Sequence, residues 1–595
     1  MKPRTTLVLA LLAAGCFAYI WYVERHSETT RQQTESSSKV LAFEQSKVQA
    51  VSIAGKDLKI ELQKKDGIWR IEQPITDRAD SFGISNILSS LEFLRHDSKI
   101  EIPAAQEKEK LQEYGVAEGD VHIKLKTEDG KETELLLGKD SAVEGKVYAR
   151  VQGSNTVFVV SNNVRSQAVK KPDEFRDKKL SDITPQQVQK VSIKTADSEI
   201  EAERKGTHWD LSKPIKARGA DSKINDLIAG LLNANVSEFL PDNPTKAQGL
   251  TEPKATITLT VEGQKDPVTL KIGGSPEGES GKDKSFAKLS NRPAVTVLAN
   301  SALDPVLKLR PNEARDRKLA RFEADVIDRV TLEPKGKPAI TLARKADGWV
   351  QKDGDKEVKI NQTIASKLVA SFQSTEVTNF VADEASDLPK YGLDKPLLKV
   401  RLSSFASENT PESKAGERAI ATLLFGTVEG DSGYAKLEEE PFVIASPKSL
   451  LESVPVHRAQ LQPLSVWEFK AEAVTTLEIT REGTTIKVEK KDNEWKPASG
   501  EGKANAESIN AVLGVLGGMH TTKWMAPEEV SKESLAKPTT TLRVTLKEGD
   551  KTATHTLTVG EALGNEGFYS KVDDKEGLFL LSPADNTSLG IKLVQ

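Results

Sequence analysis

The sequence of 595 residues has a single cysteine, Cys16, close to its N-terminus. The body of the chain therefore has no disulfide framework, no thiol nucleophile and no thiolate metal site. Acidic and basic residues nearly balance, at 88 and 84, which gives a net charge of −4. The sequence thus lacks the basic surplus that drives binding to a phosphate backbone, and we predict no nucleic-acid partner.

Residue patterns typical of catalysis are also scarce. The seven histidines form no pair at the close spacing of a helical zinc site, and no Gly-x-Ser-x-Gly nucleophile elbow occurs. The glycine-rich stretch at residues 273–285 is similar to a phosphate-binding loop, but Asp283 stands where that loop needs Ser or Thr to hold the metal. We predict no metal, no cofactor and no catalytic residue, and therefore that the chain is not an enzyme.

Only one long hydrophobic run is present, from Thr5 to Val23, and it follows the basic residues Lys2 and Arg4. As a helix this run spans roughly 28 Å, which is enough to cross a hydrocarbon core of about 30 Å. Basic residues on the short N-terminal side favour keeping that side cytoplasmic. We predict a single-pass protein of the inner (cytoplasmic) membrane, with residues 1–4 cytoplasmic, 5–23 the transmembrane anchor and 24–39 a flexible linker. The body would then be extracytoplasmic, in the periplasm.

Two alternatives compete with an uncleaved anchor. The letters LAAGC at residues 12–16 would make Cys16 the acylated first residue of a lipoprotein. Against this, the apolar run continues beyond Cys16, and Ala13 stands where the lipoprotein pattern prefers Leu. The other alternative is cleavage as an ordinary signal peptide. We favour the uncleaved anchor.

The body of the chain repeats itself. The letters KKDGIWRIEQP at residues 64–74 recur in related form at residues 204–214, 344–354 and 490–500. The tryptophans of these stretches, spaced by 140, 140 and 146 residues, are Trp69, Trp209, Trp349 and Trp495. This period is too long for a solenoid unit, so we predict that each copy is a domain with its own core. A bulky aromatic residue beside a hairpin turn is more typical of a core than of an exposed glycan platform.

Each hairpin is followed by a predicted helix with apolar residues at helical spacing. The polar residues at the starts of these helices are Asp80, Asp221, Asn361 and Asn505. Asp and Asn cap the free N–H groups of a first turn, and the apolar stripe is expected to lie on the sheet. Later strands end at Gly138, Gly273, Gly426 and Gly560. The loop before them contains glycine in three copies but reads ESLAKP at residues 533–538, so the fourth turn is predicted to differ.

Strands, one helix and strands again predict an α+β fold with a mainly antiparallel sheet and a covering helix. We place four tandem repeat domains at residues 40–178, 179–317, 318–461 and 462–595. The motifs FRDKKL at residues 175–180 and ARDRKL at 314–319 mark the first two junctions. The stretch HRAQL at 457–461 is less similar to them and marks the third.

A late strand of every copy carries an aromatic residue and, two positions on, a basic residue. The pairs are Tyr148 with Arg150, Phe286 with Lys288, Tyr434 with Lys436, and Tyr569 with Lys571. Residues two apart in a strand project from the same sheet face. Two interpretations stay open, a solvated strand face and a repeated partner-binding surface.

With these motifs and the N-terminal hydrophobic run, the chain resembles an uncharacterised bacterial family of membrane-anchored proteins. That family carries tandem copies of a domain of unknown function, and its genes often lie beside those of gliding-motility-type or auxiliary ABC transport systems. The resemblance implies a location and neighbours, without catalytic residues to carry over.

Three classes of function follow. The favoured one is a non-catalytic, membrane-anchored extracytoplasmic scaffold or accessory subunit, with ABC-type transporter subunits as partners. The alternative is a cell-wall or glycan-binding surface protein, which would need exposed aromatic residues. An enzyme is the least favoured, because it would need convergent polar residues in a pocket of one copy.

Overall fold

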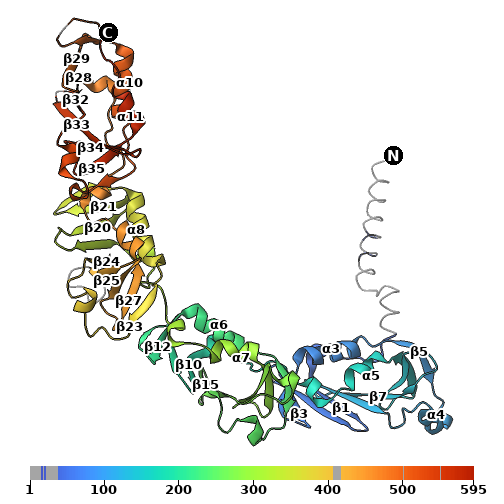
Figure 1. Ribbon diagram of the computed structural model, residues 1–595. Helices are drawn as coiled ribbons and strands as arrows, with labels where there is room; N and C mark the ends of the chain where they lie inside the picture. The colour runs from blue at the N-terminus through green and yellow to red at the C-terminus, as the bar shows by residue number, and fades with distance from the viewer. Residues whose placement is uncertain are drawn as a thin grey trace, which may run out of the picture. The chain divides into compact units, whose positions relative to one another are not determined.

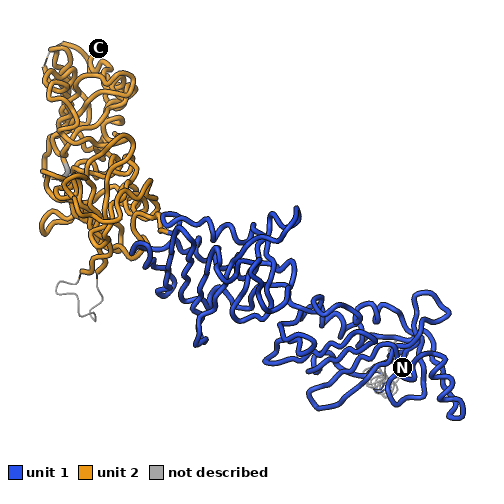
Figure 2. Tube along the Cα trace, turned by 60° about the horizontal axis from the view of Figure 1, so that its bottom comes forward, with its two compact units in different colours: residues 1–314 blue, residues 315–595 orange. Residues whose placement is uncertain are grey.

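The computed structural model describes residues 38–405, 417–499, 501–549 and 551–595, together with residues 15, 17, 19 and 21. The anchor predicted at residues 5–23 and the linker predicted at 24–39 lie almost wholly outside the described residues. In the part of the chain that is described, no helix is both long and apolar enough for a membrane span. The chain divides into two compact units, Met1–Ala314 and Arg315–Gln595 (Figure 2).

The unit Met1–Ala314 contains two nine-stranded sheets with the same strand order, and every described strand pair is antiparallel. The elements of the first repeat are β1 (Val48–Gly55), β2 (Leu58–Lys65), β3 (Ile68–Gln73), β4 (Asp77–Arg78), α3 (Ser81–Glu92), β5 (His96–Glu101), α4 (Glu107–Glu113), β6 (Val121–Thr127), β7 (Glu132–Asp140), β8 (Lys146–Val151), β9 (Thr156–Ser161) and α5 (Asn163–Ala168). Those of the second are β10 (Val188–Thr195), β11 (Glu199–Lys205), β12 (His208–Lys213), β13 (Ala217–Arg218), α6 (Asp221–Leu232), β14 (Val236–Leu240), β15 (Ala255–Val261), β16 (Val268–Ile272), β17 (Lys284–Leu289), β18 (Val295–Ala299) and α7 (Asn300–Leu307).

The unit Arg315–Gln595 contains a nine-stranded and an eight-stranded sheet. The elements of the third repeat are β19 (Arg329–Pro334), β20 (Ile340–Lys345), β21 (Gly348–Asp353), β22 (Lys356–Lys359), α8 (Gln362–Ser374), β23 (Asn379–Ala382), β24 (Leu398–Phe405), β25 (Glu417–Glu429), β26 (Ser432–Leu437), β27 (Val443–Pro447) and α9 (Lys448–Ser453). Those of the fourth are β28 (Val474–Arg481), β29 (Thr484–Lys491), β30 (Glu494–Pro497), α10 (Ala506–Gly517), β31 (Trp524–Met525), β32 (Thr540–Glu548), β33 (Lys551–Leu563), β34 (Gly567–Val572), β35 (Leu578–Leu581) and α11 (Pro583–Ser588).

The first sheet runs in the order β4-β3-β2-β1-β6-β7-β8-β9-β5, so the strand after the main helix closes the far edge. The helices α3 and α5 contribute residues such as Ile84, Leu88 and Val164 to one core on the same face of this sheet (Figure 1). A short second helix after the last strand recurs in the other repeats. The predicted single covering helix is therefore incomplete, because each repeat adds this terminal helix, whose few residues gave too weak a periodic signal.

The tryptophan hairpins share one register. The residue across the strand pair from the tryptophan is basic in each copy, as shown by the pairs Lys64↔Trp69, Arg204↔Trp209, Arg344↔Trp349 and Lys490↔Trp495. Trp69, Trp209 and Trp349 are buried, whereas Trp495 is only half-buried against its core. The guanidinium of Arg204 lies 4.5 Å from the Trp209 ring, a cation–π contact that covers the outer side of the indole.

The predicted caps hold for three of the four main helices. Asp80, Asn361 and Asn505 each accept hydrogen bonds from N–H groups of the first turn. Asp221 does not cap α6, which begins at that residue. Its carboxylate instead accepts the Trp209 N–H at 2.7 Å and contacts His208 Nδ1 at 2.7 Å, so it fixes the hairpin on the helix. The sequence prediction was wrong here because the helix begins one residue earlier than expected, which leaves Ala220 at the N-cap and makes Asp221 the first helical residue.

A close backbone approach requires the glycine that was predicted to end the strand before the aromatic–basic pair. The strand ends there only in the second repeat; in the other three it continues past the glycine, so the predicted strand end is wrong in those copies. In all four repeats a Cβ on this glycine would overlap a carbonyl oxygen of the preceding loop, as at Gly273 against Gln248. The loop itself ends on left-handed Gly249 in the second repeat and on right-handed Ala536 in the fourth. The prediction that the fourth turn differs is therefore confirmed.

We expect Gly273→Ala to destabilise the second repeat by about 1–3 kcal/mol, because the methyl group has no space beside the Gln248 carbonyl. The matched control is Gly230→Ala within α6, where an added Cβ meets nothing within 4 Å. That substitution should stabilise by about 0.5–1 kcal/mol. Hydrogen exchange of β15 and β16 peptides measures both, and equal protection in the two variants would contradict the argument.

Candidate functional site

Three of the four aromatic residues of the predicted partner face belong to a second, smaller core on the sheet face opposite the main helix. Tyr148 packs with Leu111 and Val116, and its ring centroid lies 4.6 Å from that of Tyr114. Tyr434 and Tyr391 make the corresponding contact at 5.0 Å in the third repeat. Tyr569 lies in a similar cluster, and Phe286 is likewise half-buried.

The basic residues of the same set differ in exposure. Arg150 and Lys436 are buried, Lys288 is half-buried and Lys571 is exposed. Lys436 Nζ donates to the carbonyl oxygens of Leu437 at 2.8 Å and Glu438 at 3.1 Å, which folds the loop after its strand. Burial lowers the pKa of Lys436 and of Lys288 from their ordinary values. Partner binding stays a prediction, but of these four cations only Lys571 is freely accessible.

One group of potential metal ligands, which sequence spacing did not indicate, lies in the fourth repeat. Ligand atoms of His555, Asp573 and Asp574 fall within 4.8 Å of one another. They already have protein partners, since Asp574 accepts from Trp467 Nε1 at 3.1 Å and Asp573 from the Thr556 N–H at 2.9 Å. These contacts account for the cluster as a structural link that joins the loop after β34 to β33 and to the segment before β28, and we assign no metal to it.

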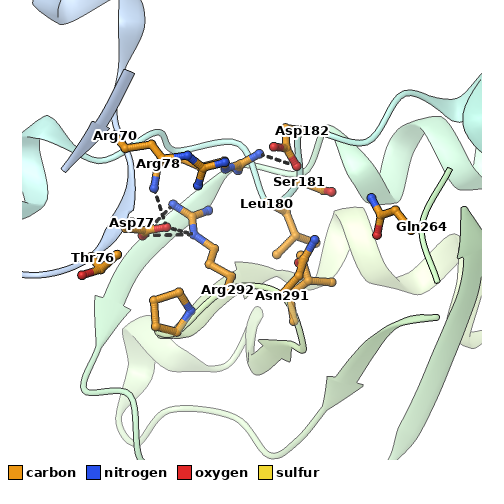
Figure 3. Close-up of a pocket in the computed structure, with 12 residues that line it drawn as sticks. Arg70, Thr76, Asp77, Arg78, Leu180, Ser181, Asp182, Gln264, Asn291 and Arg292 are labelled. Atoms are coloured by element: carbon orange, nitrogen blue, oxygen red, sulfur yellow. Dashed lines mark hydrogen bonds and ion pairs between the residues drawn. The ribbon is translucent and has the colours of Figure 1, made fainter. Parts of the chain in front are cut away.

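A larger charged cluster lies where the first and second repeats meet, within the unit Met1–Ala314 (Figure 3). The short edge strand β4 supplies Asp77 and Arg78. Arg176 directly follows the 3-10 turn η3 (Pro172–Phe175). Backbone bonds from Asp80 N to Phe175 O and from Asp177 N to Arg78 O hold these two segments together. Arg292 reaches the same place from the loop between β17 and β18 of the second repeat.

Asp77 is the central carboxylate of this cluster. Arg176 Nε and Nη2 lie 2.8 and 2.7 Å from Asp77 Oδ2, and Arg292 Nε lies 3.1 Å from both carboxylate oxygens. The two guanidinium groups also lie over the Phe239 ring, at 4.0 and 4.8 Å from its centroid. One carboxylate and one phenyl ring thus hold an arginine from each repeat.

Arg78 is the third buried arginine of the cluster, and its carboxylate partners lie nearer to solvent. Its Nη2 is 3.4 Å from Asp177 and its Nη1 is 3.3 Å from Asp182, whose side chain is 45% exposed. Three buried guanidinium groups therefore face a single buried carboxylate. Desolvation lowers the pKa of Arg292, and the neighbouring Asp77 opposes that effect.

A cavity of about 480 Å³ opens beside the cluster and is lined by residues of both repeats. Its lining includes Arg70, Arg78 and Arg292, together with the polar side chains of Thr76, Gln264 and Asn291. Figure 3 shows Arg78 and Arg292 beside the opening, joined to Asp182 and Asp77 by dashed lines. This arrangement offers hydrogen-bond donors and positive charge to a small anionic group.

Sequence comparison matches three overlapping segments to one family, described as Domain of unknown function (DUF4340), at residues 69–253, 209–386 and 353–538. The chain belongs to the DUF4340 family. It carries tandem copies of this domain. No curated protein matches the chain.

The first two DUF4340 matches begin at a hairpin tryptophan of one repeat and end beyond the main helix of the next. Each therefore contains a junction motif, with Arg176 in the first match and Arg315 in the second. Arg315 is also buried and lies over Phe380 at 3.7 Å, as Arg176 lies over Phe239. The recurrence of Arg-Asp in FRDKKL and ARDRKL was the one signal from which a structural role for these arginines could have been inferred.

Proposed function

We propose that this DUF4340 chain is a non-catalytic, membrane-anchored extracytoplasmic scaffold or accessory subunit of an ABC-type transport or gliding-like complex. The hydrophobic run at residues 5–23, the tandem copies and the family resemblance support it. In such a role the repeats present several surfaces on one tether, and linked weak contacts add up when geometry permits.

The observation that carries the proposal is the buried junction between the first two repeats. Asp77 of the first repeat accepts hydrogen bonds from Arg292 of the second, and both side chains are nearly excluded from water. Breaking such a buried pair is costly, so the contact fixes the two domains relative to each other. A fixed spacing between domains is what a protein needs to position partners at a membrane.

The glycan-binding alternative gains no support from the tryptophans. It needs exposed aromatic platforms, and Trp69, Trp209 and Trp349 are 5%, 0% and 6% exposed. We therefore put forward no second function.

Purification of the intact chain from mildly solubilised, cross-linked membranes tests the proposal. We expect membrane-spanning and nucleotide-binding transporter subunits to be recovered in a fixed ratio, and protease added to spheroplasts to degrade the body.

Lys571→Glu should lower the recovery of these subunits several-fold and leave the thermal unfolding of the chain unchanged, since this side chain is exposed.

The matched control is Lys547→Glu, which reverses an exposed charge in the same sheet. Equal recovery with both variants would remove the Lys571 surface from the proposal. Recovery of the same subunits by an unrelated protein fused to residues 1–37 would show that the body is not needed to bind them. Turnover of a substrate by the purified chain would overturn the scaffold role itself.

A further inference from the structure

Two arginines face each other across an edge strand pair of the first repeat. The register of β3 and β4 places Arg70 directly opposite Arg78. Side chains so paired project from the same face with Cβ atoms about 5 Å apart, and like charges there are destabilising. At the equivalent place in the second repeat the pair is Asp210 and Arg218, of opposite charge. The first repeat therefore keeps an unfavourable pair that its own homologous copy avoids.

Within this pair only Arg78 has carboxylate partners, Asp177 and Asp182, and none of the local protein groups neutralises Arg70. The Arg70 side chain is half-buried and makes no hydrogen bond or ion pair with any described residue. The side chain of Arg78 is only 9% exposed. Its Nη1 has no hydrogen-bond partner in the described part of the chain. Asp182 approaches that nitrogen only as an ion pair at 3.3 Å.

Both arginines line the cavity of about 480 Å³, as does Arg292. This volume falls within the range of small-molecule sites, roughly 300–1,000 Å³. Asp77 is occupied by Arg176 and Arg292, so it does not neutralise Arg70. Thr76, Gln264 and Asn291 add hydroxyl and amide groups to the wall. The lining also includes Asp77 and Asp182, so its three arginines exceed its two carboxylates by one (3−2=1). The cavity thus keeps a positive charge and the donors that an oxyanion requires.

We propose that this cavity binds a phosphate group, with Arg70 and Arg78 as its principal ligands and Arg292 beside them. Guanidinium groups match a phosphate with paired N–H donors, and an anion between Arg70 and Arg78 turns a repulsive pair into an attractive one. Because the wall comes from both repeats, the bound anion would also tighten their junction. The inference does not depend on the proposed scaffold role.

Thermal unfolding and calorimetric titration of the full chain test the proposal, with inorganic phosphate, glycerol phosphate or sodium chloride at equal ionic strength. We expect millimolar phosphate to raise the Tm of the unit Met1–Ala314 by several degrees over chloride, since a ligand that binds only the folded state stabilises it. A similar shift with both phosphates assigns the site to the free anion. A larger shift with glycerol phosphate assigns it to a phosphate ester.

The decisive variant is Arg70→Asp, which copies the Asp210 of the second repeat. It should raise Tm in chloride, because Arg78 loses a like-charged neighbour and gains a further carboxylate beside Asp177 and Asp182, yet lose the phosphate shift. Arg70→Met should lose the shift with a smaller gain, because it removes the repulsion without adding a carboxylate. Lys64→Asp, on the same hairpin but outside the cavity lining, should keep the shift. Absence of any phosphate shift in the unaltered chain, or an equal shift in Arg70→Asp, overturns the proposal.

Discussion

Asp77→Ala is expected to lower the free energy of unfolding of the first two repeats by about 3–5 kcal/mol. The substitution leaves Arg176 and Arg292, which are 5% and 3% exposed, without the carboxylate that both contact. A buried cation that loses its partner keeps the full cost of desolvation. Chemical denaturation of the full chain, with hydrogen exchange of the peptides around β4 and residues 176–182, measures the loss where it arises.

The matched control is Asp182→Ala, which removes a carboxylate from the same junction at a position 45% exposed. Exposed ion pairs contribute about 0–1 kcal/mol, so this variant should unfold almost as the unaltered chain does. Limited proteolysis within residues 177–182 should accelerate in Asp77→Ala alone. If both variants lost a similar free energy of unfolding, burial would not determine how much these ion pairs stabilise the junction.

Trp209→Ala should destabilise the second repeat by about 3–5 kcal/mol, the usual cost of truncating a buried aromatic side chain. Trp209 is fully buried, and its Nε1 donates to Asn225 Oδ1 at 3.0 Å. The cavity would also remove the surface under the Arg204 guanidinium, which lies 4.5 Å from the ring. Hydrogen exchange across α6 and β11 reports the loss.

Trp495→Ala provides the comparison in the fourth repeat, because the same register position there is only half-buried. Its cost should be clearly smaller, since less apolar surface returns to water. A third variant, Trp209→Phe, keeps most of the ring and removes the hydrogen bond to Asn225, at a cost of about 1 kcal/mol. If Trp495→Ala proved the more damaging of the two alanine variants, the hairpin tryptophans would not act through burial.

Local patterns in the sequence predicted the local structure well. Alternating apolar residues and the turns at Asp66-Gly67 and Asp492-Asn493, where the structure has positive φ angles, indicated the hairpins. The helical spacing of Ile84, Ile87, Leu88 and Leu91 indicated the buried stripe of α3. These signals depend on neighbours a few residues apart, which is why one sequence suffices for them.

The junction was beyond such patterns. Asp77 meets Arg176 and Arg292 across 99 and 215 positions of the chain, and single letters carry no information about pairs so distant. The same holds for Lys436, which has the letters of a surface residue and is buried because the carbonyl oxygens of its own loop surround its Nζ. Sequence reasoning located the repeats and missed what joins them.

Because Arg292 of the second repeat pairs with Asp77 of the first, the segment that is duplicated in the sequence is smaller than the segment that forms a complete folded structure. A cut between residues 178 and 179 divides the sequence at its period, yet it parts Asp77 from Arg292 and exposes the Phe239 ring on which Arg176 lies. Fragments ending there would each expose a charged, half-assembled surface. Genetic shuffling of these copies would therefore favour moving the first two together, as a single inherited block with two internal copies.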